Sequence, residues 1–113
     1  MGDILTERVL RAVEQIPSGK VVAYGDLARL VGTGPRQVGR IMSTWGSSVA
    51  WWRVTNASGD LPLGLMAAAR RQWEDEGIER KPNGRGCRIA HYRADLVQLA
   101  AAYERAVADL RDA

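Results

Sequence analysis

A tight glycine-containing turn between two short helical segments constrains the fold of this chain more than any other sequence feature. The turn spans residues 32–35 (Gly-Thr-Gly-Pro), and residues 24–31 before it carry apolar side chains at helical spacing. Gly32 is a typical C-terminal stop for that helix. Pro35 suits the first turn of the next helix, where its missing N–H is tolerated, and this helix is expected to reach residue 43. Two short helices joined in this way predict a helix-turn-helix.

The remaining segments predict a mainly α chain with a small β hairpin. Further helices are expected over residues 6–16, 65–76 and 95–111, and a short extended stretch over residues 20–23. Residues 78–92 contain Asn83-Gly84, a strong hairpin signal, between two basic segments. A basic hairpin after a helix-turn-helix resembles a wing. The expected fold is therefore a winged helix-turn-helix-like single domain over residues 1–113, with the last helix as a C-terminal extension.

Length and composition fit one soluble domain. The chain has 113 residues, of which 46% are apolar and 26% charged, enough for a core and a polar surface. No run approaches the roughly 20 apolar residues of a membrane span, and the acidic N-terminus lacks the basic start of a secretory signal. A single cysteine, Cys87, allows neither an internal disulfide nor a thiolate metal site of its own. We expect a cytoplasmic monomer (nucleoid-associated if bacterial) without membrane contact, cofactor or metal.

The charge distribution indicates a polyanionic partner. The net charge is +3 and the isoelectric point is near 9.5, but the placement of the charge says more than its sum. The basic residues form a middle group and a C-terminal group: Arg29, Arg36, Arg40 and Arg53, then Arg80, Lys81, Arg85, Arg88 and Arg93. Acidic residues gather at the two ends of the chain and at residues 74–76. If the basic residues share one face, that face suits contact with DNA phosphates.

Three segments follow one another in an informative order. Residues 16–28 include Tyr-Gly-Asp-Leu-Ala, residues 36–42 run Arg-Gln-Val-Gly-Arg-Ile-Met, and residues 50–54 run Ala-Trp-Trp-Arg-Val. Together they resemble the DNA-binding, active-site domain of the O6-alkylguanine-DNA alkyltransferases, over roughly residues 10–77. The resemblance implies that the partner is double-stranded DNA containing alkylated guanine.

The residues at the reactive position differ from those of the enzymes. The enzymes carry Pro-Cys-His-Arg-Val where this chain has residues 50–54; their cysteine accepts the alkyl group and their histidine activates it. Here Trp51 and Trp52 stand at those two positions. An indole forms no thiolate, so the sequence predicts no transfer chemistry at this site. Tryptophan in place of the cysteine resembles the alkyltransferase-like proteins, a family that binds the lesion without repairing it and hands it to nucleotide excision repair.

The resemblance also implies roles for individual side chains in DNA binding and base flipping. Arg36 would fill the place of the flipped base in the minor groove, and Tyr24 would press on the 3′ phosphate. Gln37 and Arg40 would contact DNA from the same helix. The flipped guanine would stack on Trp51, a contact worth about 1–3 kcal/mol. The expected pocket consists of Trp51, Trp52, Arg53 and Val54.

Simpler interpretations compete with the pocket at several positions. Core packing is favoured for Trp45 and Trp52, and a structural role in holding the motif is favoured for Arg53. Trp52 also departs from the family, which usually keeps a histidine there, whereas Glu76 matches the glutamate that orients the histidine in the enzymes. The loop of residues 60–66 is short and carries no positive charge, so the family's loop arginine has no counterpart in it.

Two other functions are also compatible with the sequence. A winged-helix regulator could bind DNA without lesion specificity, with Arg36, Gln37 and Arg40 as its candidate base readers. An active transferase using Cys87 is disfavoured, because the sequence offers no activating neighbourhood beyond His91. Dependence of binding on the lesion distinguishes the sensor from the regulator, and label transfer from alkylated DNA would identify the transferase.

Overall fold

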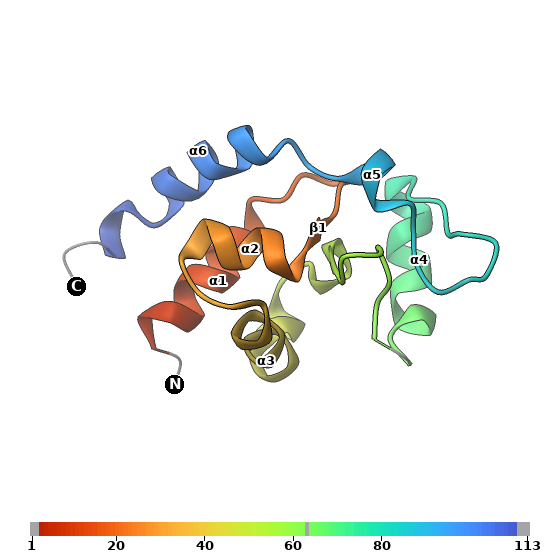
Figure 1. The fold of residues 1–113 in the computed structure, drawn as a ribbon, viewed down its shortest axis with the longest axis horizontal. Coiled ribbons are helices and arrows are strands. Elements are labelled where there is room, and N and C mark those ends of the chain that lie inside the picture. Colours follow the sequence, from red (N-terminus) through yellow and green to blue (C-terminus); the bar gives the residue numbers. More distant parts are fainter. Residues whose placement is uncertain (1–2, 63, 111–113) are drawn as a thin grey trace.

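The computed structural model describes residues 3–62 and 64–110, which form a mainly helical domain (Figure 1). The α-helices are α1 (Ile4–Glu14), α2 (Tyr24–Val31), α3 (Pro35–Trp45), α4 (Met66–Glu76), α5 (Ile89–Tyr92) and α6 (Leu96–Ala106). Short 3-10 turns form η1 (Gly46–Ser48), η2 (Trp51–Arg53) and η3 (Ala108–Leu110). The strands are β1 (Val22–Ala23) and β2 (Val54–Thr55). The mainly α fold with a helix-turn-helix is thus confirmed.

Local capping signals fix the ends of the first helices. The Asp3 carboxylate accepts a hydrogen bond from the Thr6 N–H (2.8 Å) and caps α1. The helix α2 ends at Gly32, whose φ of 89° lies in the left-handed region that glycine adopts without strain. Pro35 opens α3, which continues to Trp45, two residues beyond the predicted end. The helix-turn-helix therefore lies where the sequence places it.

The main core lies between the helix-turn-helix and the two terminal helices. Val9 and Val13 of α1, Leu27 of α2 and Val38 of α3 are fully buried in one cluster. The helix α6 runs along α1 and α2 (Figure 1) and adds Leu99 and Tyr103 to that cluster. Arg11 links α1 to α6, because its Nη1 donates a hydrogen bond to the Ala106 carbonyl oxygen (2.9 Å). The C-terminal segment is thus part of the core.

The last helix is shorter than expected. It spans Leu96–Ala106 and is followed by η3, whereas the sequence predicted residues 95–111, of which residue 111 lies outside the described residues. Asp95 caps it by accepting from the Val97 and Gln98 N–H groups. Leu96, expected on the buried stripe, is 39% exposed. The buried stripe therefore begins one turn later, at Leu99.

A two-stranded parallel sheet joins the helix-turn-helix to the tryptophan motif. Val22 pairs with Val54 and Ala23 with Thr55. The extended stretch before α2 was predicted, but its partner was not. Because β1 leads directly into Tyr24 and β2 follows directly from Arg53, this pairing brings the start of α2 beside η2. Among the described residues no helix is long and apolar enough to cross a membrane.

Residues 78–92 do not form the predicted hairpin. The turn at Asn83-Gly84 is present, since the Gly84 N–H donates to the Lys81 carbonyl oxygen (2.8 Å) and the Lys81 N–H donates to that of Gly86 (2.6 Å). The flanking residues, however, form no strands, and the second flank continues into α5. The small sheet of this fold is β1–β2, and no β wing is found in the described part of the chain.

The turn of residues 56–60 pairs with residues 86–87, where a hairpin would have had a second strand. The Cys87 N–H donates to the Gly59 carbonyl oxygen (2.9 Å), and Asp60 forms an antiparallel bridge with Gly86. The Lys81 ammonium group lies 2.7 Å from the Asp60 carboxylate. Residues 81–87 therefore close a local turn, but the strand-like pairing of residues 86–87 is with a distant turn, which local sequence signals could not indicate.

Candidate nucleic-acid interface and base pocket

An open pocket of about 410 Å³ lies beside the helix-turn-helix. Its lining comes from α2, α3, η1, η2, β2 and the loop before α4: Tyr24, Gly39, Met42, Ser43, Gly46, Ser47, Trp51, Val54, Leu61, Pro62 and Leu65. Pockets that hold drug-sized ligands typically measure about 300–1,000 Å³ and are mainly apolar with a few polar groups. The pocket is thus large enough for a small planar ligand such as a nucleobase.

Trp51 forms one wall of this pocket. Its backbone N–H donates to the Val49 carbonyl oxygen (2.7 Å), which tightens the chain ahead of η2. Its ring meets that of Trp52 edge to face, with centroids 5.8 Å apart and planes at 84°. Trp51 is half-buried, so part of its ring remains available to the pocket. Of the residues expected in the pocket, the structure brings Trp51 and Val54 together there.

Trp52 and Arg53 lie outside the pocket lining, at a buried carboxylate. The Trp52 Nε1–H donates to Glu76 Oε2 (2.8 Å), and the Arg53 guanidinium contacts the same oxygen through Nη2 at 2.7 Å. Arg53 also donates from Nη1 to the Ile16 carbonyl oxygen (2.9 Å). The structural role favoured for Arg53 agrees with these contacts, and Trp52 takes part through its polar edge as well as its packing.

Glu76 connects three segments of the chain. Besides Trp52 and Arg53, it accepts a hydrogen bond from the Gly19 N–H (2.8 Å). Burial by itself raises the pKa of Glu76, but the hydrogen bonds from Arg53, Gly19 and Trp52 outweigh it and lower the pKa overall. Glu76 is therefore an ionised acceptor that fixes η2 against α4 and the turn before β1.

Tyr24 is placed at the pocket by the start of α2. It is the first residue of that helix, half-buried, and burial raises the pKa of its hydroxyl, so the group stays neutral and can donate a hydrogen bond. The buried Asp26 holds this end of the helix, because its carboxylate accepts from the Ala23 N–H (2.8 Å). Tyr24 and Trp51 thus line one cavity from different helices, although the expected pocket did not include Tyr24.

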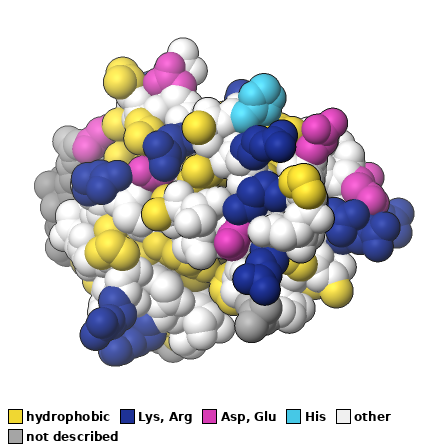
Figure 2. All heavy atoms as spheres, turned by 45° about the vertical axis from the view of Figure 1, so that its right-hand side comes forward, with side chains coloured by type: hydrophobic (Ala, Val, Ile, Leu, Met, Phe, Trp, Pro, Cys, Tyr) yellow, Lys and Arg dark blue, Asp and Glu magenta, His cyan; other side chains and the backbone are white. Residues whose placement is uncertain are grey.

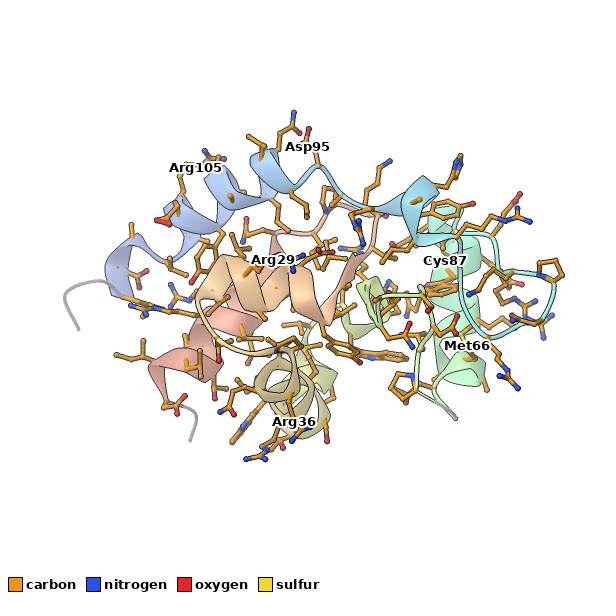
Figure 3. The ribbon with its side chains drawn as sticks, in the orientation of Figure 1. Arg29, Arg36, Met66, Cys87, Asp95 and Arg105 are labelled. Atoms are coloured by element: carbon orange, nitrogen blue, oxygen red, sulfur yellow. The ribbon has the colours of Figure 1, made fainter. Side chains whose placement is uncertain are left out.

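The other DNA-binding candidates lie on the exposed side of α3. Arg36, Gln37 and Arg40 are all exposed, and none forms an ion pair with another residue of the described ranges. Arg36 lies at the outer edge of the molecule (Figure 3). Because Gly39, Met42 and Ser43 of the same helix line the pocket, α3 connects the exposed arginines to the cavity.

On the face shown in Figure 2, the basic side chains do not form one uninterrupted patch. Figure 2 shows lysine and arginine side chains with acidic and apolar ones between them. Several are engaged in ion pairs: Arg29 and Arg93 with Asp26, Lys81 with Asp60, and Arg53 with Glu76. The arginines of α3 are free of such pairs within residues 3–62 and 64–110, which makes them the best placed for phosphate contact.

Cys87 is buried in a second apolar cluster with Val21, Leu61 and Trp73. Burial raises the pKa of its thiol to about 11. At neutral pH the thiol is therefore protonated, whereas alkyl transfer requires a thiolate. It also lies outside the pocket lining. This environment agrees with the inert role expected from the sequence.

Several residues that build the site carried no usable sequence signal. Trp73 is fully buried, and its Nε1–H donates to the Trp52 carbonyl oxygen (2.7 Å), yet its position in α4 suggested only a helix. Leu61 and Leu65 form the rim from a loop whose path depends on contacts with residues 86–87. Trp45, expected in the core or the pocket wall, is 39% exposed at the end of α3.

Comparison with known proteins agrees with this geometry. Residues 5–80 match the DNA-binding domain of 6-O-methylguanine DNA methyltransferase, and the chain belongs to this family. The relatives include Alkyltransferase-like protein 1 of Schizosaccharomyces pombe, 40% identical over 80 residues, with 64% of this chain and 74% of that protein covered. A DNA base-flipping protein of Escherichia coli K12 is 40% identical over 65 residues, covering 54% of this chain. The chain spans about half the length of this E. coli relative, 50%.

Solved structures extend the comparison to the fold. The crystal structure of S. pombe Atl1 in complex with damaged DNA containing O6-carboxymethylguanine matches with a TM-score of 0.68 and 33% identity. The match covers 84% of this chain and 98% of that one. A second S. pombe complex with DNA gives a TM-score of 0.66. The family resemblance predicted from residues 16–54 is confirmed.

Proposed function

We propose that this protein recognises O6-alkylated guanine in double-stranded DNA and does not remove the alkyl group. The observation that carries the proposal is the pocket itself: an apolar cavity beside the helix-turn-helix, walled by Trp51 where the enzymes have their acceptor cysteine. A base taken out of the duplex needs a flat face to stack on and a space that receives it. The indole and the cavity supply both, and no thiolate is available there.

Binding would place α3 in the minor groove. Arg36 would enter the base stack where the guanine leaves it, while Gln37 and Arg40 contact the backbone. Tyr24, at the start of α2, would press on the phosphate beside the flipped nucleotide. The recognised lesion would then be passed to nucleotide excision repair. The relatives support this assignment, since they are named for base flipping and for likeness to alkyltransferases, not for alkyl transfer.

The test is a titration of two matched duplexes, one with guanine and one with O6-methylguanine at the same position, followed by fluorescence anisotropy at fixed salt. The salt must be fixed because phosphate contacts make affinity strongly salt-dependent. We expect tighter binding of the lesion, and loss of that preference in Trp51→Ala, Tyr24→Phe and Arg36→Ala. Arg105→Ala, which removes an exposed charge from α6, serves as the matched control and should keep the preference.

Equal affinity for the two duplexes would overturn lesion recognition and leave a general DNA-binding protein. The structure offers less support to that alternative, because the predicted wing is not formed in the described residues. Transfer of a radiolabelled alkyl group from the DNA to the protein would instead identify an enzyme. Both outcomes are read from the same protein preparation, so the three functions are separated by one set of samples.

A further inference from the structure

We propose that the pocket selects guanines carrying neutral alkyl groups and discriminates against those carrying an anionic group. This inference rests on the proposed function and names the class of adduct that the site accepts. It follows from what lines the cavity. Among the described residues the lining contains no charged side chain. Within the described lining, the polar side chains are the hydroxyls of Tyr24, Ser43 and Ser47.

The part of the wall away from α2 is formed by flexible or apolar groups. Leu61, Pro62 and Leu65 form the rim before α4, and Met42 approaches from α3. Met42 lies over Gly46, since a Cβ at position 46 would come within 3.1 Å of the Met42 Cε. A thioether chain with three rotatable bonds adapts its shape to apolar ligands of different size. This wall therefore suits alkyl groups from methyl upward.

The basic groups nearest to the pocket in sequence are engaged or directed elsewhere. Arg53 follows Trp51 in η2, but its guanidinium contacts Glu76 and the Ile16 carbonyl oxygen. Arg36 and Arg40 lie on the exposed side of α3, outside the lining. A carboxylate that enters the cavity with the base therefore loses part of its water and gains no counter-charge from the described lining. Burial of an unpaired charge is among the costliest events in a protein interior.

The adduct in the S. pombe comparison structure provides a charged ligand for testing this preference. The S. pombe protein was crystallised with DNA containing O6-carboxymethylguanine, an anionic adduct. A carboxymethyl group and a propyl group have nearly the same size, and only the first is charged. We expect this protein to bind O6-propylguanine at least about tenfold more tightly than O6-carboxymethylguanine in the same duplex. O6-methylguanine should also bind more tightly than O6-carboxymethylguanine.

The experiment is a set of four duplexes that differ only in one base: guanine, O6-methylguanine, O6-propylguanine and O6-carboxymethylguanine. A variant supplies the missing charge. Leu65 is 39% exposed at the pocket rim, ahead of α4, so Leu65→Arg introduces a guanidinium there with little effect on the core. We expect Leu65→Arg to reduce the preference for propyl over carboxymethyl several-fold. Ala67→Arg adds the same charge to an exposed position of α4 outside the lining and should leave the ratio unchanged.

Different results would overturn the proposed function and the preference for neutral adducts. Equal binding of all four duplexes overturns the proposed function, and the inference with it. Tighter binding of the three adducts than of guanine, with no difference between propyl and carboxymethyl, overturns the inference alone. An unchanged ratio in Leu65→Arg also contradicts it, provided that thermal unfolding shows the variant to be folded. A change of the ratio in Ala67→Arg equal to that in Leu65→Arg assigns the effect to net charge and contradicts a pocket origin.

Discussion

At position 52 this protein carries a side chain that can donate a hydrogen bond but cannot accept or release a proton. The family usually has histidine here, and in the enzymes that histidine joins the glutamate to the reactive cysteine. In this structure the Trp52 indole keeps the hydrogen bond to Glu76 (2.8 Å). The ring also stacks edge to face on Trp51 and lies 5.7 Å from the Arg53 guanidinium carbon. The glutamate thus acts as an anchor for the pocket wall and has no proton to relay.

The first prediction concerns this hydrogen bond. Trp52→Phe keeps an aromatic ring and removes the donor, so near pH 7 it should lower the free energy of unfolding by about 2 kcal/mol, as expected for a hydrogen bond to a charged group. The pKa of Glu76 is lowered in the folded protein, so its stabilisation is present above the ordinary value of 4.5 and is lost as the pH falls through the lower folded value. The difference between Trp52→Phe and the parent protein should therefore shrink on acidification.

Urea unfolding at a series of pH values measures this difference. Trp45→Phe is the matched control, because Trp45 is 39% exposed and its indole donates no hydrogen bond to another described residue. A loss of stability in Trp52→Phe that stays constant from neutral pH to below 4 would assign the effect to packing and contradict the hydrogen-bond account. Added loss of lesion preference, with the fold intact, would show that the anchor positions Trp51 for the base.

At the scale of elements, the rim of the pocket depends on two irregular segments that hold each other. The turn of residues 56–60 leads into Leu61 and Pro62 of the lining, and residues 81–87 cover that turn. Gly59 lies where they meet: its φ is 85°, and a Cβ there would overlap the Cys87 carbonyl oxygen. Both the backbone conformation and the close approach require glycine at this position.

The second prediction is that Gly59→Ala destabilises the protein by about 3 kcal/mol, through steric overlap and strain in the left-handed region. Gly84→Ala is the matched control. Gly84 also has a positive φ, 72°, but a Cβ there meets nothing within 4 Å, so only the conformational strain of about 1 kcal/mol is expected. Chemical denaturation measures both. Equal losses of stability in the two variants would contradict the close contact between residues 81–87 and the turn of residues 56–60.

At the scale of the whole molecule, the sequence predicts those structural features that are determined by residues close together in the chain. The end of α2 and the start of α3 follow from Gly32 and Pro35, each of which acts on its own helix. The first helix was predicted over residues 6–16 but spans Ile4–Glu14, because Asp3 caps it two residues earlier. The family resemblance assigned Tyr24 to a DNA phosphate and Trp51 to the pocket, whereas both line one cavity, because the β1–β2 pairing brings their segments together. The path of residues 78–92 was not predictable in this way. It is set by hydrogen bonds to residues 56–60, more than 20 positions away, which compete with the Asn-Gly hairpin signal.

The third prediction tests which side of the molecule meets DNA. Arg40 on α3 and Arg105 on α6 are both exposed arginines without an ion pair among the described residues, and α3 and α6 lie on opposite sides of the molecule (Figure 1). Each neutralised phosphate contributes about 0.9 to the slope of log affinity against log salt. Arg40→Ala should therefore lower this slope by about one contact and weaken binding to damaged and undamaged duplexes alike. Arg105→Ala changes the net charge by the same amount and should leave the slope unchanged. Equal effects of the two substitutions would indicate that DNA affinity depends only on the total charge of the protein. That result would contradict the assignment of α3 to the DNA-binding face.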